Sequence, residues 1–473
     1  MRTIFRLGAL AAATLVLAGC ASVSIDQAVQ ETNETAKGFT QGQLELSRTD
    51  EQRQARSKLT EQLLAKPLTM NDAVQLALAN SPAVQALLAQ SWSDLASATQ
   101  AGRIANPVFT FERSRFNGEL ELQRLLSFGL LELLTLPQRQ IISRSQVAQA
   151  KVQLSANVVE QVTQVRHSWV RAVAAQQTLA YAEQVSGSAQ ASAELARRMQ
   201  QVGNITTLQR ARQHAFYADA AARLASAQHA ATAAREELVR QLGLTDAQAA
   251  QLKLPTRLPE LPNEPRQPGD VSAIAMQQRL DVGLARHQLD VVGKSQGLNL
   301  LDSLTDVELG VRRDTVFDND AGTKAARRGY ELAIRLPIFD WGSAKRDRMS
   351  AQVLGAANRY DSVVRSASSQ LRESYSAYRT AYDLARHFRD EIVPLGKTIA
   401  DENVLRYSGM LIGVFELLAD SRDQIARVMA AINAQQQFWL ADSALAASVI
   451  GKPIAMAAMP SAGPASSGSE AAH

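Results

Sequence analysis

The side chains that could bind a metal ion or catalyse a reaction are sparse and scattered. None of the six histidines has the HxxxH spacing of a zinc site, and no CxxC pair exists because the chain has a single cysteine. Glycine-rich phosphate-binding motifs and the GxSxG motif of serine hydrolases are also missing. The sequence therefore predicts no enzyme, no metal site and no cofactor. We interpret the histidines as helix-surface residues: His167, His214, His229, His287, His387 and His473.

The single cysteine, Cys20, ends a segment typical of a secretion signal. Two arginines precede an apolar run from Leu7 to Gly19, which is too short to remain as a membrane-spanning helix. The tetrapeptide "LAGC" resembles the bacterial lipoprotein signal, in which the cysteine receives acyl chains such as palmitate and becomes the first mature residue. We expect residues 1–19 to be removed and Cys20 to be lipidated, and Ala21 favours the outer membrane by the same resemblance. The alternative is ordinary secretion with an incidental cysteine.

The charge balance and hydropathy limit the partners. Removing the signal peptide leaves 48 basic and 46 acidic side chains, which argues against nucleic acid as a ligand. No other stretch has the 18–20 consecutive apolar residues, roughly, of a membrane helix. If the mature chain crosses a membrane, it must do so with strands.

The mature chain contains two similar halves. "NSPAVQALLAQ" (80–90) aligns with "QRLDVGLARHQ" (278–288), and Leu136-Pro137 aligns with Leu336-Pro337, both at an offset of about 200 residues. The predicted order is a lipidated extension (20–66), repeat 1 (67–254), a proline-rich connector (255–269), repeat 2 (270–452) and a disordered tail (453–473).

Each half is predicted to contain a helix, two strands, a very long helix and a returning helix. The first helix is expected over Asn71–Ile104, and the strands fall within residues 106–134 around Asn117-Gly118. In the second half, the strands 306–317 and 329–339 flank a polar loop. Val307, Leu309 and Val311 share one face, and a second set shares a face opposite Glu331 and Arg335: Tyr330, Leu332, Ile334, Leu336 and Ile338.

The long helices have coiled-coil spacing. No proline and a single glycine occur from Gln138 to Val202, a rod of roughly 100 Å. Its apolar seam is Leu154, Val158, Val162, Val165, Trp169 and Val173. The matching seam near the 3.5-residue repeat is Tyr360, Val364, Ala367, Leu371, Tyr375, Tyr378, Tyr382 and Ala385. The fold class is therefore mostly α with a small β part, in two tandem repeats.

The stretch "LPIFDWGSAKRD" (336–347) is predicted to join strand to helix. Pro337 ends the strand ladder, Phe339 and Trp341 suit a membrane-boundary aromatic girdle, and Gly342 permits the change of direction before a cap at Asp340 or Ser343. Pro137 is the equivalent position in the first half. A surface loop with two aromatic residues is the alternative interpretation.

Four amphipathic strands cannot close a barrel and would leave unpaired edges in lipid. Copies of the chain must therefore pool their strands, and three copies give twelve strands, which begin to leave a passage.

The chain resembles the TolC family of outer-membrane efflux channels, in its lipid-anchored subgroup. The matching stretches are "LTMNDAVQLALANSPAVQALLAQ" (68–90), "QRLDVGLARHQLDVVG" (278–293), "LAIRLPIFDWGSAKRDRMSAQ" (332–352) and "YSGMLIGVFELLADSR" (407–422). The resemblance implies a homotrimer with a 12-stranded outer-membrane barrel and a helical periplasmic tunnel. It also implies a periplasmic adaptor and an inner-membrane transporter as partners, with outer-membrane lipid around the barrel.

In the family, the tips of the helical hairpins form a periplasmic entrance lined by acidic residues. The tips fall here near Gly203-Asn204 and Ser408-Gly409. By resemblance, Glu416 takes one acidic position, Tyr407 takes the tyrosine of the tether, Asp420 can replace an acid missing at Ala419, and Thr207 stands where the first tip has an acid. Solvated helix-end charges are the alternative interpretation of Glu416 and Asp420.

A second hypothesis is a lipid-anchored periplasmic coiled-coil scaffold or adaptor without a pore. It explains the signal, Cys20 and the long helices, but it gives no reason for paired strands with an apolar stripe.

Overall fold

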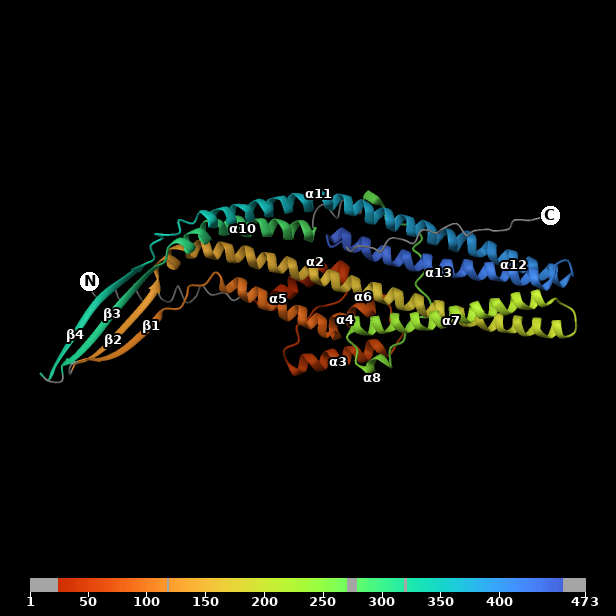
Figure 1. The fold of residues 1–473 in the computed structure, drawn as a ribbon, viewed down its shortest axis with the longest axis horizontal. Helices are drawn as coiled ribbons and strands as arrows, with labels where there is room; N and C mark the ends of the chain where they lie inside the picture. The colour runs from red at the N-terminus through yellow and green to blue at the C-terminus, as the bar shows by residue number, and fades with distance from the viewer. Residues whose placement is uncertain (1–23, 117–118, 270–278, 319–320, 454–473) are drawn as a thin grey trace. The chain divides into compact units, whose positions relative to one another are not determined.

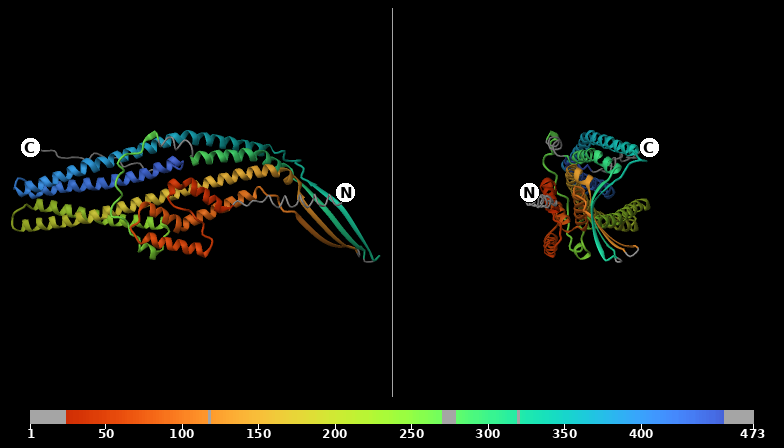
Figure 2. Two further views of the ribbon diagram at one scale, coloured as in Figure 1. Left: turned by 180° about the vertical axis from the view of Figure 1, so that it is seen from behind. Right: turned by 90° about the vertical axis from the view of Figure 1, so that its left-hand side faces the viewer.

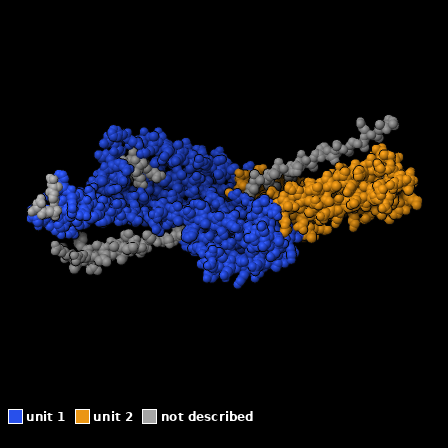
Figure 3. Space-filling model, turned by 60° about the horizontal axis from the view of Figure 1, so that its bottom comes forward, with its two compact units in different colours: residues 1–165, 236–255, 276–369 blue, residues 166–235, 256–275, 370–473 orange. Residues whose placement is uncertain are grey.

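A computed structural model describes residues 24–116, 119–269, 279–318 and 321–453. The predicted signal peptide, Cys20 and nearly all of the predicted tail lie outside the described residues. The chain is mostly helical with one small sheet, as predicted, and it divides into two compact units that Figure 3 colours separately. Unit 1 comprises residues 1–165, 236–255 and 276–369, and unit 2 comprises residues 166–235, 256–275 and 370–473.

The sheet belongs to unit 1 and has four antiparallel strands in the order β1-β2-β3-β4 (Figure 1). The strands are β1 (Val108–Phe116), β2 (Glu119–Gly129), β3 (Val307–Asp318) and β4 (Thr323–Ile334). Each half of the chain supplies one hairpin, and the hairpins join where β2 pairs with β3, with Leu126 opposite Val311. The predicted strand pairs therefore form one sheet whose outer strands are β1 and β4.

Three predicted strand limits were wrong. The second strand ends at Gly129, because residues 130–134, which are apolar on both faces, begin helix α6 (Leu130–Gln201). The fourth strand starts at Thr323, inside the predicted polar loop, because its residues pair with β3 from Asp318 onward. The same strand ends at Ile334 and not at Phe339.

Besides the sheet, unit 1 contains helices from both halves of the sequence. They are α2 (Ile25–Thr40), α3 (Asp50–Leu64), α4 (Met70–Asn80), α5 (Pro82–Gln100), α8 (Asp246–Ala249) and α10 (Leu280–Leu304). The helix predicted over Asn71–Ile104 is in fact two, because Ser81 is extended and Pro82 starts α5, where its missing N–H costs nothing. Thr69 and Asp72 form a capping box at the start of α4.

The long helices α6, α7 (Thr207–Leu242) and α11 (Ser343–His387) each have residues in both units. The predicted seam of α6 is confirmed, since all six side chains from Leu154 to Val173 are buried. In α11 the seam is buried at Ala367 and again at Tyr378, Tyr382 and Ala385, whereas Val364 is exposed. None of the described helices is long and apolar enough to span a bilayer.

Unit 2 also contains a π-helical turn (Phe388–Ile392), α12 (Val393–Ser408) and α13 (Val414–Ile450). Its core is aromatic. Phe438 of α13 is fully buried and lies 5.7 Å from the ring centroids of both Tyr378 and Tyr382 of α11. The rings of Phe438 and Trp439 pack edge to face at 5.1 Å. These contacts join α11 to α13.

The proline-rich connector forms neither helix nor strand over residues 255–267, and its backbone is hydrogen-bonded to this aromatic core (Figure 2 shows its course from behind). Tyr382 donates its hydroxyl to the carbonyl of Asn263 at 2.9 Å, and Trp439 donates its indole N–H to the carbonyl of Pro259 at 3.0 Å. Because proline-rich segments lack internal hydrogen bonds, these side chains satisfy connector carbonyls and fix its position on α11 and α13.

Candidate functional site

The four-stranded sheet exposes two faces of different chemistry. Side chains alternate between the faces of a strand, and the register assigns each residue to one of them. We name the first the apolar face: Phe109, Phe111, Leu120, Leu122, Leu126, Phe128, Val307, Leu309, Val311, Phe317, Tyr330, Leu332 and Ile334. Tyr330 is 86% exposed and Leu332 is 57% exposed, so chain folding leaves this surface uncovered.

The opposite face carries most of the sheet's carboxylates, and we name it the acidic face. Its acidic residues are Glu112, Glu119, Glu121, Glu308, Asp314, Asp318 and Glu331. Arg312 and Arg327 are its basic residues, and Arg312 pairs with Asp314 at 2.7 Å. The predicted opposition of Glu331 to Tyr330 and Leu332 is confirmed by the register. Leu336 and Ile338 lie beyond the end of β4, although both are exposed.

The structure places the two predicted strand–helix junctions differently. Pro137 lies inside α6, so it is not a junction residue, and β2 passes directly into α6 after Gly129. In the second half, residues 335–342 separate β4 from α11. Gly342 has a φ of +74°, a left-handed conformation that favours glycine.

The second junction exposes its aromatic side chains. Phe339 is 98% exposed and Trp341 is 72% exposed. The turn is held by Asp340, which accepts the backbone N–H of Gly342 at 2.8 Å and pairs with Lys345 at 3.0 Å. The carboxylate therefore fixes the start of α11, while two large aromatic rings are left without a cover.

Both helical hairpins of unit 2 turn at the predicted tips. α6 ends at Gln201 and α7 begins at Thr207, with Gly203 at a φ of +77° and Asn204 beside it. α12 ends at Ser408 with Gly409 as its C-cap, but the left-handed residue is Met410, with a φ of 59°. Met410 is 94% exposed, and neighbouring Leu411 is exposed as well. The Met410 backbone is strained, because a positive φ is uncommon for a residue other than glycine.

The four predicted gate residues lie on three helices of unit 2, namely α7, α12 and α13. Glu416 lies exposed in the first turn of α13, Tyr407 is exposed near the end of α12, and Thr207 accepts a hydrogen bond from Gln200 at 3.2 Å. Asp420 is half-buried and accepts a hydrogen bond from the side-chain amide of Asn403, which ties α12 to α13.

Sequence reasoning missed a contact between the two hairpins of unit 2. The guanidinium of Arg422 on α13 lies 4.3 Å from the ring centroid of Phe216 on α7 and donates to the side chain of Gln213 at 3.3 Å. A stacked arginine with a polar partner holds two helices in one position more firmly than an exposed ion pair does. The contact therefore links α7 to α13, a few residues along each helix from its tip. Arg422 ends the stretch "YSGMLIGVFELLADSR" (407–422), but nothing local marks its partner.

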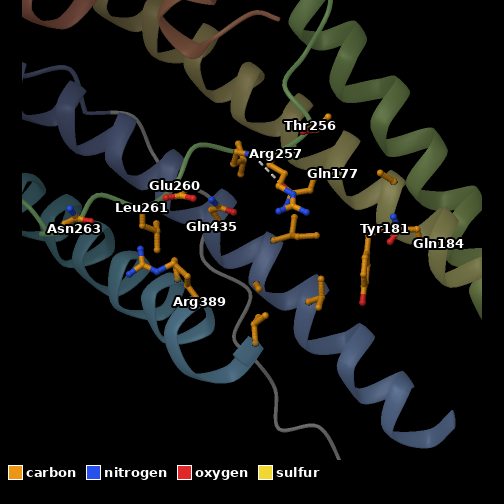
Figure 4. A pocket seen from close by; sticks show the side chains of 17 residues that line it. Gln177, Tyr181, Gln184, Thr256, Arg257, Glu260, Leu261, Asn263, Arg389 and Gln435 are labelled. Carbon is orange, nitrogen blue, oxygen red and sulfur yellow. Dashed lines mark hydrogen bonds between the residues drawn. The ribbon is translucent and has the colours of Figure 1, made fainter. Parts of the chain in front are cut away.

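A hollow with a volume of about 970 Å³ lies in unit 2 and is lined in part by the connector (Figure 4). Residues of α6, the connector, α11 and α13 line it, including Tyr181, Arg257, Glu260, Arg389 and Gln435. Arg389 already pairs with Asp390 at 2.6 Å. In the described part of the chain, no three His, Cys, Asp or Glu side chains are grouped to hold a metal ion.

Four polar side chains of α6, the connector and α13 interact in unit 2: Arg166, His167, Arg266 and Asp442. Arg266 of the connector pairs with Asp442 of α13 at 2.9 Å, and burial raises the pKa of Asp442, while the charges of Arg266 and Arg166 oppose that shift. Burial lowers the pKa of Arg166. Burial also lowers the pKa of His167 from 6.5 to about 4; Arg171 adds to the shift, and a hydrogen bond to the backbone of Leu440 opposes it. The group holds α6, the connector and α13 together.

Comparison with solved structures identifies the fold. A membrane protein from Pseudomonas aeruginosa aligns with a TM-score of 0.67 and 18% identity over 80% of this chain and 93% of that one. The outer membrane protein VceC of Vibrio cholerae aligns with a TM-score of 0.65 and 16% identity, over 81% of this chain and 96% of that one. The CmeC outer membrane channel of Campylobacter jejuni aligns with a TM-score of 0.65 and 13% identity, over 84% of this chain and 86% of that one.

The chain has the fold of outer-membrane channel proteins. The TolC-family fold expected from the sequence is thereby confirmed. No family model and no curated protein matches the sequence.

Proposed function

We propose that this chain is the outer-membrane channel component of a tripartite export system. Three copies close a 12-stranded barrel, which continues as a helical tunnel into the periplasm. Substrates pass through it from an inner-membrane transporter and a periplasmic adaptor to the exterior. The channel is a passive conduit, so the energy for transport comes from the transporter. No metal or cofactor takes part.

One observation carries this proposal: a four-stranded sheet with two open edges exposes an apolar face and an acidic face. An edge strand in lipid must find a partner, because each unpaired backbone group there costs several kcal/mol, roughly. β1 and β4 are the edges of the sheet. Pairing β4 of one copy with β1 of the next removes every edge when the ring closes.

The two faces fit the two environments of such a barrel. An apolar face in contact with acyl chains buries its phenylalanines and leucines, and an acidic face lining the lumen keeps its carboxylates in water. The reverse arrangement would place seven carboxylates in hydrocarbon. A soluble scaffold gives no cover for Phe109, Tyr330 or Leu332, which is why the alternative of a pore-free adaptor is not favoured.

The junction and the anchor agree with this orientation. Phe339 and Trp341 are exposed where β4 gives way to α11, the place where the barrel would meet the membrane boundary. Cys20, lipidated, would hold the N-terminal extension on the periplasmic side of the same membrane.

The hairpin tips are the proposed periplasmic end, where an adaptor docks. Their exposed apolar residues, Val202, Leu208, Met410 and Leu411, are more numerous than their charges and suit a contact with another protein. Glu416, Asp420, Tyr407 and Thr207 are the proposed gate residues. Asp420 acts within one copy by holding α12 to α13 through Asn403, while exposed Glu416 is available to the pore.

Membrane retention without the lipid tests this proposal. The Cys20→Ser variant should still sediment with outer membranes, be extracted only by detergent, and run as a trimer, because the barrel holds it there. Purified Cys20→Ser protein should also produce conductance steps in a planar bilayer. A Cys20→Ser protein that is soluble, monomeric and without conductance would establish the scaffold instead.

A further inference from the structure

The apolar face is interrupted by arginines that stand side by side on three strands. The register pairs Arg124 of β2 with Arg313 of β3, and Arg313 with Arg328 of β4. We name these three residues the arginine row. Phe111 of β1 is the fourth member of the same row, because it pairs with Arg124. Three more basic residues, Arg113, Arg115 and Lys324, lie on this face nearer the hairpin turns.

All the residues of this face that carry charge are basic. Following the register through the described parts of β1 to β4 gives six basic and no acidic side chains on the apolar face, against seven acidic and two basic on the acidic face. Like charges opposite one another on neighbouring strands are destabilising. Three adjacent arginines therefore require an anion that this face of the sheet does not supply.

The contacts of these basic side chains also include no carboxylate among the described residues. Arg124 donates to the hydroxyl of Thr315 at 3.2 Å, and the Lys324 ammonium lies 5.2 Å from the Phe317 ring centroid. Among the described residues, none of the six basic side chains forms an ion pair with a carboxylate. Arg313 and Arg328 are exposed. On the acidic face, by contrast, Arg312 has its carboxylate in Asp314.

A sister copy does not supply the missing anion either. In the trimer, β4 pairs with β1 of the next copy, and β1 presents to this face only Phe109, Phe111, Arg113 and Arg115. The anion must therefore come from outside the protein, at the surface that faces lipid.

The arginine row lies near the middle of the strands, and the other basic residues of this face lie between it and the hairpin turns. Val311 and Tyr330 form the row next to it on the side of the helices, followed by Leu309 and Leu332, and then Val307 and Ile334. In the proposed barrel the acyl chains contact these apolar rows, so the arginine row meets the boundary where headgroups begin. Long basic side chains at such a boundary extend toward phosphate.

We propose that Arg124, Arg313 and Arg328 bind the phosphates of a membrane lipid whose headgroup carries more than one phosphate. Neighbouring strands are about 4.8 Å apart, so the row spans roughly 10 Å, too wide for one phosphate and suited to two. Guanidinium groups bind phosphate with paired, charge-assisted hydrogen bonds. This inference rests on the proposed channel, because only there does the apolar face meet lipid.

Lipid retention by the assembled channel tests the inference. The full chain is reconstituted in phosphatidylcholine nanodiscs doped with a bis-phosphorylated glucosamine-disaccharide lipid, its monophosphorylated form or phosphatidylglycerol, and bound lipid is counted by native mass spectrometry. Wild type should bind the bis-phosphorylated lipid several-fold more tightly than either other probe. R124Q/R313Q/R328Q should bind it at least tenfold more weakly, and R313Q alone should show a partial loss.

The matched control is R327Q. Arg327 precedes Arg328 on β4 and is also exposed, but it points to the acidic face, so its substitution should leave lipid binding unchanged. Equal binding by wild type and both row variants, equal binding of all three probes, or an equal loss in R327Q would overturn the inference. Trimer mass and conductance are recorded in the same nanodiscs. A conducting trimer with any of these results removes the lipid site alone, whereas a chain that forms no trimer and no pore refutes the channel as well.

Discussion

His167 makes the stability of unit 2 depend on pH. Its imidazole lies on α6, is largely buried and hydrogen-bonds the backbone of Leu440 on α13, and its pKa is lowered from 6.5 to about 4. When the pKa of a base is lower in the folded chain than in the unfolded chain, protonation of that base destabilises the native state. Its contribution is complete above pH 6.5 and is lost as the pH falls toward 4, because the unfolded chain then binds a proton that the folded chain resists.

The size follows from these two pKa values. Between pH 7.5 and pH 4.5, one such group lowers the free energy of unfolding by about 2.5 kcal/mol. His167→Gln keeps a side-chain amide that can donate to the carbonyl of Leu440 and removes the titration. The difference in unfolding free energy between wild type and this variant should therefore shift by about 2.5 kcal/mol in favour of the variant over that range.

Denaturant titration of the detergent-solubilised protein at several pH values measures this difference. The control is His214→Gln on α7, where the side chain is exposed and the substitution should change the free energy of unfolding by no more than about 0.5 kcal/mol. A His167→Gln variant that loses stability in parallel with wild type from pH 7.5 to 4.5 would show that His167 is not held neutral by burial.

Three further predictions concern the barrel, the gate and the core. Leu332→Arg in the Cys20→Ser background should reduce the amount of trimer recovered from membranes, because a charge on the lipid face costs about 2–4 kcal/mol at mid-membrane. Ala333→Arg on the acidic face should not reduce it. Equal recovery of the two variants would contradict the assignment of the faces. Glu416→Ala should lower cation selectivity in reversal-potential measurements, and unchanged selectivity would remove Glu416 from the pore. Phe438→Ala should lower the free energy of unfolding by about 3–5 kcal/mol in denaturant titrations, since its ring is fully buried against Tyr378 and Tyr382. A loss below about 1 kcal/mol would contradict that packing.

The parts of the fold that depend on local pattern could be predicted from the sequence. The seam of α6, the hairpin turn signals and the alternation of Tyr330, Leu332 and Ile334 are properties of neighbouring residues. The limits that failed depend on distant partners. Residues 323–328 are strand because β3 pairs with them, and residues 130–134 are equally apolar in helix and strand, so periodicity could not separate the two.

Only the turn positions of the candidate site follow from local sequence. Gly203, Asn204, Gly409 and Gly342 lie at turns, where glycine and asparagine give a local signal. The arginine row could not be predicted, because it requires the register between β2 and β3, which lie nearly 190 residues apart in the chain. The Arg422–Phe216 contact joins α13 to α7 in the same nonlocal way.

Disulfide trapping between the two edge strands tests the central claim most directly, namely that sister copies complete the sheet. Within one copy, β1 and β4 are three strand spacings apart, about 14 Å, which is too far for a disulfide. In the Cys20→Ser background, Glu112→Cys on β1 is combined in turn with Ala325→Cys, Arg327→Cys or Gly329→Cys on β4. Gln123→Cys on the interior strand β2 replaces Glu112→Cys as the control. We expect an oxidised covalent trimer for at least one β1–β4 pair and none for the β2 controls. Monomers at every β1–β4 pair would contradict the completion of the sheet by sister copies.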